Sequence, residues 1–167
     1  MALFQKLYQL KTSQFIPAPM DEVWEYFSAP ENLQTITPDY MGFEITSKSG
    51  DKMYPGMIIT YLVSPVMNIK MRWATEITQV KHQEYFIDEQ RFGPYNLWHH
   101  QHHFKEMDGG VLMNDIVHYG IPFGPIGQLA NTLFVKKQLR EIFDYRIKAV
   151  EKRWPGEIKI EPSLTFL

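Results

Sequence analysis

The chain has 167 residues, 44% of them hydrophobic, and a formal net charge of −2 at pH 7. This length predicts one domain, and a domain of this size buries roughly 70% of the surface that its unfolded chain exposes, which allows a core that also holds a cavity. The absence of cysteine excludes disulfides, thiolate nucleophiles and cysteine-ligated metals. The charge shows no basic excess, so we expect no nucleic-acid partner.

We expect a single domain over residues 1–167, with a core at about 5–153 and a C-terminal tail at 154–167. The N-terminus lacks the pattern of a cleavable signal peptide, and no apolar run approaches the roughly 20 residues that span a bilayer. Together with the absence of cysteine, these features favour a cytoplasmic protein without a membrane span.

The first predicted element is a strand at 7–16, which ends at the prolines of IPAP because proline has no N–H for a strand ladder. A first helix follows, with Asp21 and Glu22 in its first turn, where carboxylates suit the positive end of the helix dipole. The stretch ENLQTI is expected to form a second short helix, which ends before Pro38.

From residue 41 to 119 the apolar pattern has a period of two, as in strands with one buried face. The clearest strand is 69–79, in which Ile69, Met71, Trp73, Thr75 and Ile77 share one face. The six strand candidates are FEITS, MIITYLV, NIKMRWATEITQV, EYFIDEQRF, LWHHQHHFKEM and GVLMNDIVHYG.

A helical period returns from about 125 to 153, with two apolar stripes that are rotated from each other. The first stripe holds Ile126, Leu129, Ala130 and Leu133; the second holds Leu139, Ile142, Phe143, Ile147 and Val150. A long helix of this kind bends or covers two surfaces. The destination of the apolar tail cannot be read from the sequence.

These elements predict an α+β fold, with a curved antiparallel sheet of about seven strands around a long C-terminal helix and two short helices after the first strand. All the connections between the predicted strands suit antiparallel pairing. Such a sheet leaves space between its concave face and the long helix.

Four of the six histidines lie in the octet LWHHQHHF at 97–104. Asp108 and Gly109 between two alternating runs predict a hairpin with a type I′ turn, which fixes the register of both strands. In that register one face of the hairpin points into the cavity, and it carries Trp98, His100, His102, Phe104, Asp115 and Tyr119. The opposite face carries His99, His103 and His118, which we interpret as a solvated surface.

Three roles remain open for His100 and His102, which lie about 7 Å apart at the backbone. They could bind a metal with Asp115 as a third ligand, or form a structural pair in which Asp115 fixes the tautomer of His102. They could also line a ligand pocket. The sequence has no second HxH and no HExxH motif, so we favour the pocket and expect no metal and no cofactor.

Two segments, IPAPMDEVWEYFSAPENLQTITP and DEQRFGPYNLWHHQHHFKEMDGGVLMNDIVHYGIPFGP, resemble the START-like or SRPBCC superfamily with the helix-grip fold. The resemblance spans about residues 5–150 and is closest to bacterial ligand-binding members labelled polyketide-cyclase-like or cell-division-inhibitor-like. It implies one START-like domain that binds an apolar ligand, such as a lipid, between the sheet and the long helix. It says little about activity, because this fold hosts carriers, receptors, cyclases, hydrolases and allergens.

The leading hypothesis is a non-catalytic pocket for a small hydrophobic molecule. Its apolar walls would come from Met71, Trp73, Trp98, Phe104 and Tyr119, and its polar groups from His100, His102 and Asp115. The alternative is an enzyme of cyclase, dehydratase or isomerase type, with His102 and Asp115 as the general base pair and His100 or Tyr119 as proton donor. An interaction protein is a third class, and the sequence leaves open a homodimer and the orientation of Gln90.

Overall fold

The computed structural model describes residues 6–66 and 69–167. Gln5, where the expected core begins, and Asn68, which opens the expected third strand candidate, lie outside these ranges. The chain begins with β1 (Leu7–Ile16) and α1 (Met20–Ser28), followed by two 3₁₀ helices at Pro30–Ile36 and Asp39–Met41. The predicted first strand and both short helices are confirmed. Proline at the start of the first 3₁₀ helix separates it from α1.

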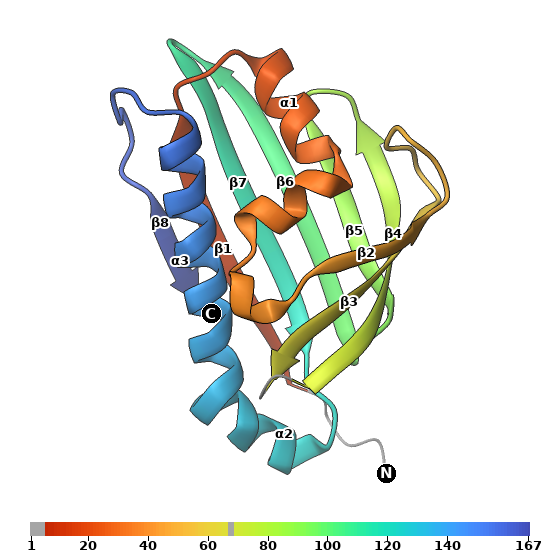
Figure 1. The fold of residues 1–167 in the computed structure, drawn as a ribbon. Coiled ribbons are helices and arrows are strands. Elements are labelled where there is room, and N and C mark those ends of the chain that lie inside the picture. The colour runs from red at the N-terminus through yellow and green to blue at the C-terminus, as the bar shows by residue number, and fades with distance from the viewer. Residues whose placement is uncertain (1–5, 67–68) are drawn as a thin grey trace.

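The described strands form one sheet of eight, in the order β2-β3-β4-β5-β6-β7-β1-β8, and every neighbouring pair is antiparallel. The strands are β2 (Glu44–Lys48), β3 (Met57–Val66), β4 (Ile69–Lys81), β5 (Tyr85–Phe92), β6 (Leu97–Met107), β7 (Gly110–Gly120) and β8 (Ser163–Phe166). The sheet curves, and the long C-terminal helix lies across its concave face (Figure 1). The predicted α+β helix-grip arrangement is confirmed.

The described residues form eight strands, in agreement with the expected number of about seven, and the additional strand is β8 of the C-terminal tail. This short strand pairs with the edge of β1 that β7 leaves free, with Leu10 opposite Phe166. An edge strand presents unpaired N–H and C=O groups, so a tail with alternating apolar residues can add to it. Nothing within the tail itself specifies this partner, which explains why its destination was not predicted.

The predicted register of the β6–β7 hairpin is confirmed, with His102 opposite Asp115 and Met107 opposite Gly110. The turn differs from the prediction, because Gly109 has a φ of +80° whereas Asp108 has no positive φ. A type I′ turn requires positive φ at both central residues. The register therefore depends on the length of the turn and the alternation of the strands rather than on that turn type.

The long helix is interrupted by a π-helical turn at Asn131–Val135, between α2 (Gly124–Ala130) and α3 (Lys136–Arg153). Tyr119 donates a hydrogen bond to the side chain of Asn131 at this turn. A π turn inserts an extra residue into the helix and rotates the apolar stripe. The second stripe faces the sheet, with Leu139, Phe143 and Val150 buried.

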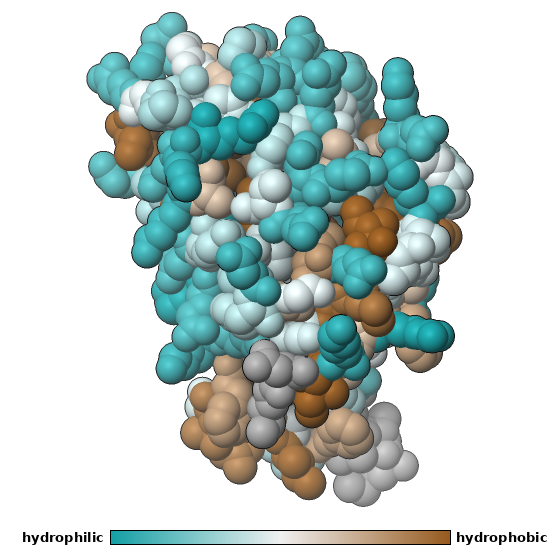
Figure 2. Space-filling view, in the orientation of Figure 1, coloured by the Kyte–Doolittle hydropathy of each residue, from teal (hydrophilic) through white to brown (hydrophobic). Residues whose placement is uncertain are grey.

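The first stripe points away from the sheet. Ile126, Leu129 and Leu133 are 75%, 61% and 54% exposed. Figure 2 shows apolar residues gathered at the end of the molecule where α2 lies. Of the long helix, only the α3 part therefore covers the concave face.

The two ends of β7 allow a matched test of packing at glycine. A Cβ at Gly110 would lie 2.2 Å from the backbone oxygen of Ile16, whereas a Cβ at Gly120 would meet its nearest atom, of Leu97, at 3.6 Å. Gly110→Ala should destabilise the protein by about 1–3 kcal/mol because backbone cannot move aside as a side chain can. Gly120→Ala should change the free energy of unfolding by less than about 1 kcal/mol. Urea denaturation measures both, and equal effects would contradict the packing at Gly110.

Candidate functional site

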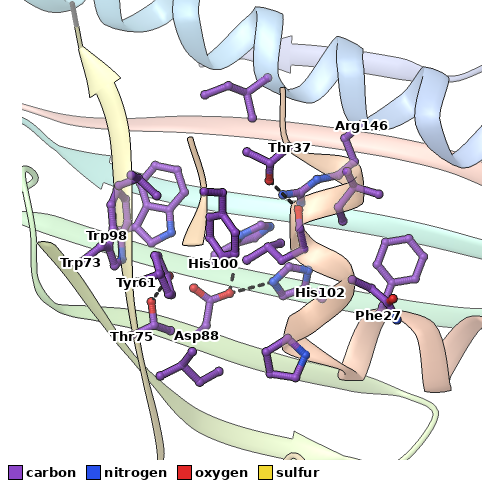
Figure 3. Close-up of a pocket in the computed structure, with 18 of the residues that line it drawn as sticks. Phe27, Thr37, Tyr61, Trp73, Thr75, Asp88, Trp98, His100, His102 and Arg146 are labelled. Atoms are coloured by element: carbon purple, nitrogen blue, oxygen red, sulfur yellow. Dashed lines mark hydrogen bonds and ion pairs between the residues drawn. The ribbon is translucent and has the colours of Figure 1, made fainter. Parts of the chain in front are cut away.

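A cavity of about 160 Å³ lies between the concave face of the sheet, the 3₁₀ helix after α1, and α3. Its lining is mostly apolar and draws on every layer of the fold. The apolar lining includes Phe27, Leu33, Ile36, Ile59, Val63, Trp73, Tyr95, Trp98, Leu139, Ile142 and Phe143. Figure 3 shows Trp73 and Trp98 at one end of this pocket, and Arg146 and Phe27 at the other.

Four of the eight residues expected in the site line the cavity, namely Trp73, Trp98, His100 and His102. Met71, Phe104, Asp115 and Tyr119 are not among the lining residues. Phe104 lies under α1, with its ring 5.5 Å from that of Trp24. The strand alternation gives the correct face of the sheet for all of them. It does not tell which part of that face is filled by core side chains and which part stays open.

Polar groups from four neighbouring strands meet in two adjacent rows on the concave face. Asp88 of β5 is the register partner of His100, His102 is the partner of Asp115, and Asp115 is the partner of Thr12 of β1. Asp88 and both histidines face the cavity, and the hydrogen bond between His102 and Asp88 is drawn in Figure 3. Asp115 lies behind the histidines, where it accepts a hydrogen bond from Thr12 at 3.0 Å.

The two carboxylates hold the histidine pair from both sides. Nε2 of His102 lies 2.8 Å from Asp88 and Nδ1 lies 2.9 Å from Asp115. The second contact has the distance of an ion pair but not the geometry of a hydrogen bond. Nε2 of His100 lies 3.0 Å from Asp115, and its Nδ1 lies 3.6 Å from Asp88. Both ring nitrogens of His102 therefore face a carboxylate.

Burial and neighbouring charge act in opposite directions on this cluster. Burial alone raises the pKa values of Asp88 and Asp115, but hydrogen bonds from the histidines and the nearby positive charges outweigh it and lower both. Burial lowers the pKa of His102, but its two carboxylate partners outweigh this effect and raise it. For His100, burial and the charge of His102 prevail, so its pKa is lowered.

These shifts favour a particular set of charge states in the cluster. They favour the carboxylate form of Asp88 and Asp115, the imidazolium form of His102 and the neutral form of His100. Arg146 adds a fixed positive charge in the cavity wall. Two negative and two positive groups then balance, which allows four ionised side chains to lie in one buried region.

The sequence did not assign Asp88 and Arg146 to the site. Asp88 shares a face of β5 with Phe86, but the FGPY loop gave no register for that strand, so the face could not be derived. Arg146 has a clearer signal. It follows Leu139 and Phe143 at helical spacing and precedes Val150, so it is a charged residue within the buried stripe of α3.

The side chain of Gln90, whose orientation the sequence left open, contacts the backbone of Tyr95. Its side-chain amide donates to the carbonyl oxygen of Tyr95 at 2.6 Å, and its side-chain oxygen accepts from the Tyr95 N–H at 3.2 Å. Gln90 therefore closes the loop between β5 and β6. This contact holds the Tyr95 ring in the wall of the cavity.

Among the described residues, Asp88, His100 and His102 form a group that could hold a metal ion, with one ligand atom from each within 4.8 Å of the others. Imidazole and carboxylate suit Zn²⁺ or Fe²⁺. A metal would have to replace the hydrogen bond between Asp88 and His102 and displace the proton that the two carboxylates favour on His102. The contacts within the cluster thus compete with metal binding.

Outside the cavity, the histidines on the opposite face of β6 contact polar neighbours. His99 lies 3.0 Å from Glu89, and His103 contacts Gln101 at 3.0 Å. His118 of β7 lies opposite His99. These contacts agree with the interpretation of this face as a polar surface.

No family model and no curated protein matches the sequence. Solved structures do match the fold. A protein from Thermus thermophilus has a TM-score of 0.63 and 18% identity, over 87% of this chain and 95% of that chain. The di-domain ARO/CYC BexL from the BE-7585A biosynthetic pathway has a TM-score of 0.68 and 12% identity, over 90% of this chain and 51% of that one.

Major latex-like protein 151 from Panax ginseng has a TM-score of 0.62 and 11% identity, over 90% of this chain and 99% of that chain. At identities this low, the structural matches establish a shared fold. This fold is the one that the resemblance to the START-like superfamily implied. Among the described residues, no helix is both long enough and apolar enough to cross a membrane.

Proposed function

We propose that the protein binds a small, mostly apolar molecule between the sheet and α3. The observation that carries this proposal is an apolar cavity with a few convergent polar groups, which is the usual composition of a ligand pocket. The cavity volume of about 160 Å³ is close to that of an engineered 150 Å³ cavity that holds benzene. A group the size of one ring therefore fits without rearrangement.

A cyclase, dehydratase or isomerase is the second candidate, because a buried cluster of groups with shifted pKa values lines the cavity. The structural similarity to the di-domain ARO/CYC BexL points the same way. His102 is poorly placed as the base, since a carboxylate faces each of its nitrogens. Neutral His100 and Asp88 would have to exchange the proton with a ligand.

Native mass spectrometry of the protein purified from its own source tests the binding function. We expect an organic molecule that dissociates on denaturation. A bound zinc or iron ion would instead support a metal site at Asp88, His100 and His102. An empty protein that takes up no apolar probe would overturn the proposal. The same spectrum gives the oligomeric state and tests for a homodimer.

A further inference from the structure

The cavity wall contains buried N–H groups without a hydrogen-bond partner among the described residues. They are Nε1 of Trp73, and Nε and Nη1 of Arg146. Nδ1 of His102 also lacks a hydrogen bond, but it lies 2.9 Å from an oxygen of Asp115. The open groups of Trp73 and Arg146 belong to residues at opposite ends of the pocket (Figure 3).

Three polar oxygens in the same wall have partners. The hydroxyl groups of Tyr61 and Thr75 hydrogen-bond each other, and one oxygen of Asp88 accepts from His102. The buried groups of Trp73 and Arg146 that lack a hydrogen-bond partner are N–H donors. A molecule that satisfies these donors has to present acceptors.

Arg146 is the stronger of the two open donors, because it is charged and only 9% exposed. Its guanidinium lies 4.8 Å from the centre of the Phe143 ring, which supports one face of the group but accepts no N–H···O bond. Asp88 is affected by the charge of Arg146 without a direct contact between them. A buried guanidinium without an acceptor is unfavourable, so an acceptor in the cavity would lower the free energy of the complex.

We propose that the occupant of the cavity is an apolar molecule with a carboxylate group, and that Arg146 binds this carboxylate. The inference rests on the ligand-binding function proposed above. A planar guanidinium donates two parallel hydrogen bonds to a carboxylate, which gives a stronger contact than a neutral acceptor or a hydroxyl group receives. Cationic ligands are disfavoured at this end of the cavity, because the guanidinium of Arg146 repels a positive charge.

Binding of 4-phenylbutanoate and 4-phenylbutanol, followed by the fluorescence of the tryptophans in the cavity wall, tests the proposal. The two probes share an apolar body and differ in the end group. We expect the carboxylate to bind about tenfold to 100-fold more tightly than the alcohol. Arg146→Met keeps an unbranched apolar side chain and removes the charge, so the ratio of the two affinities should fall to near one.

Arg140→Met is the matched control, because Arg140 lies on the same helix but is exposed, and it stacks on Phe166, which does not line the cavity. This variant should keep the wild-type preference. Equal affinity of the wild type for both probes, or an unchanged ratio in Arg146→Met, would overturn the role of Arg146 and leave the cavity function standing. Failure of the wild type to bind either probe would overturn the proposed function itself.

Discussion

Asp115→Asn should destabilise the protein by about 3–5 kcal/mol near pH 6 and lower the pKa of His102. Asp115 is buried and contacts three groups at once, namely His100, His102 and Thr12. The substitution keeps the shape of the side chain and removes its charge. His102 then retains one carboxylate, Asp88, and the burial that disfavours the imidazolium becomes the stronger effect.

The size of this effect should depend on pH with a defined sign. The pKa of Asp115 is lowered on folding, so its contribution is present above the unfolded value of about 3.9 and is lost as pH falls through the folded value. The pKa of His102 is raised, so its contribution is fully present below about 6.5 and is lost as pH rises through the folded value. The difference between wild type and variant should therefore be largest at about pH 4–6.5.

Urea denaturation at several pH values measures the stability difference, and NMR titration of the imidazole resonances measures the pKa of His102. Asp108→Asn is the matched control, because Asp108 is fully exposed and pairs with Lys159 at the surface. Such pairs contribute little, so this change should be close to neutral. An unchanged pKa of His102 in Asp115→Asn would show that the two side chains do not interact.

The double variant Trp98→Ala plus His100→Ala should weaken the binding of 4-phenylbutanoate at least about 30-fold, with the fold retained. Both residues line the cavity from the same face of β6, and Trp98 packs edge-on against Trp73 at 5.4 Å between ring centres. Removal of both side chains takes away an aromatic wall and a polar group of the cluster. Large aromatic residues in such positions commonly dominate binding energy.

Isothermal titration of the double variant and of His103→Gln checks this prediction. His103 lies on the opposite face of β6, so its substitution should leave the affinity within about twofold. Circular dichroism establishes that each variant is folded, and Trp98→Ala alone provides a second test if the loss of His100 disturbs the buried cluster. Undiminished affinity in the folded double variant would place the ligand away from the β6 face of the cavity.

The sequence predicted the sheet, its curvature around a long helix and the β6–β7 register because these depend on local periodicity and loop length. The facing of His100 and His102 followed directly. Asp88 was missed because its strand is joined to β6 by a loop whose register depends on side-chain contacts of Gln90. Such contacts form only in the folded chain, so alternation alone could not place that carboxylate.

The extent of the cavity could not be predicted from the sequence either, because it depends on tertiary packing. Phe104 and Trp98 lie on the same face of one strand, yet Phe104 packs against Trp24 while Trp98 lines the open space. The difference comes from where α1 and α3 cross the sheet. A helix pattern predicts which residues are buried but not the point at which the helix crosses the sheet.

The position of β1 between β7 and β8 affects the order in which the protein folds. From β2 to β7 each strand pairs with the next in sequence, so these pairings close short loops. The first strand has no such neighbour, because Leu10 pairs with Val117 and Phe166 from distant parts of the chain. Closure of these long loops is entropically unfavourable and slow. During synthesis we therefore expect the first strand to stay unpaired until β7 has been made, and the β8 pairing to complete the sheet later still.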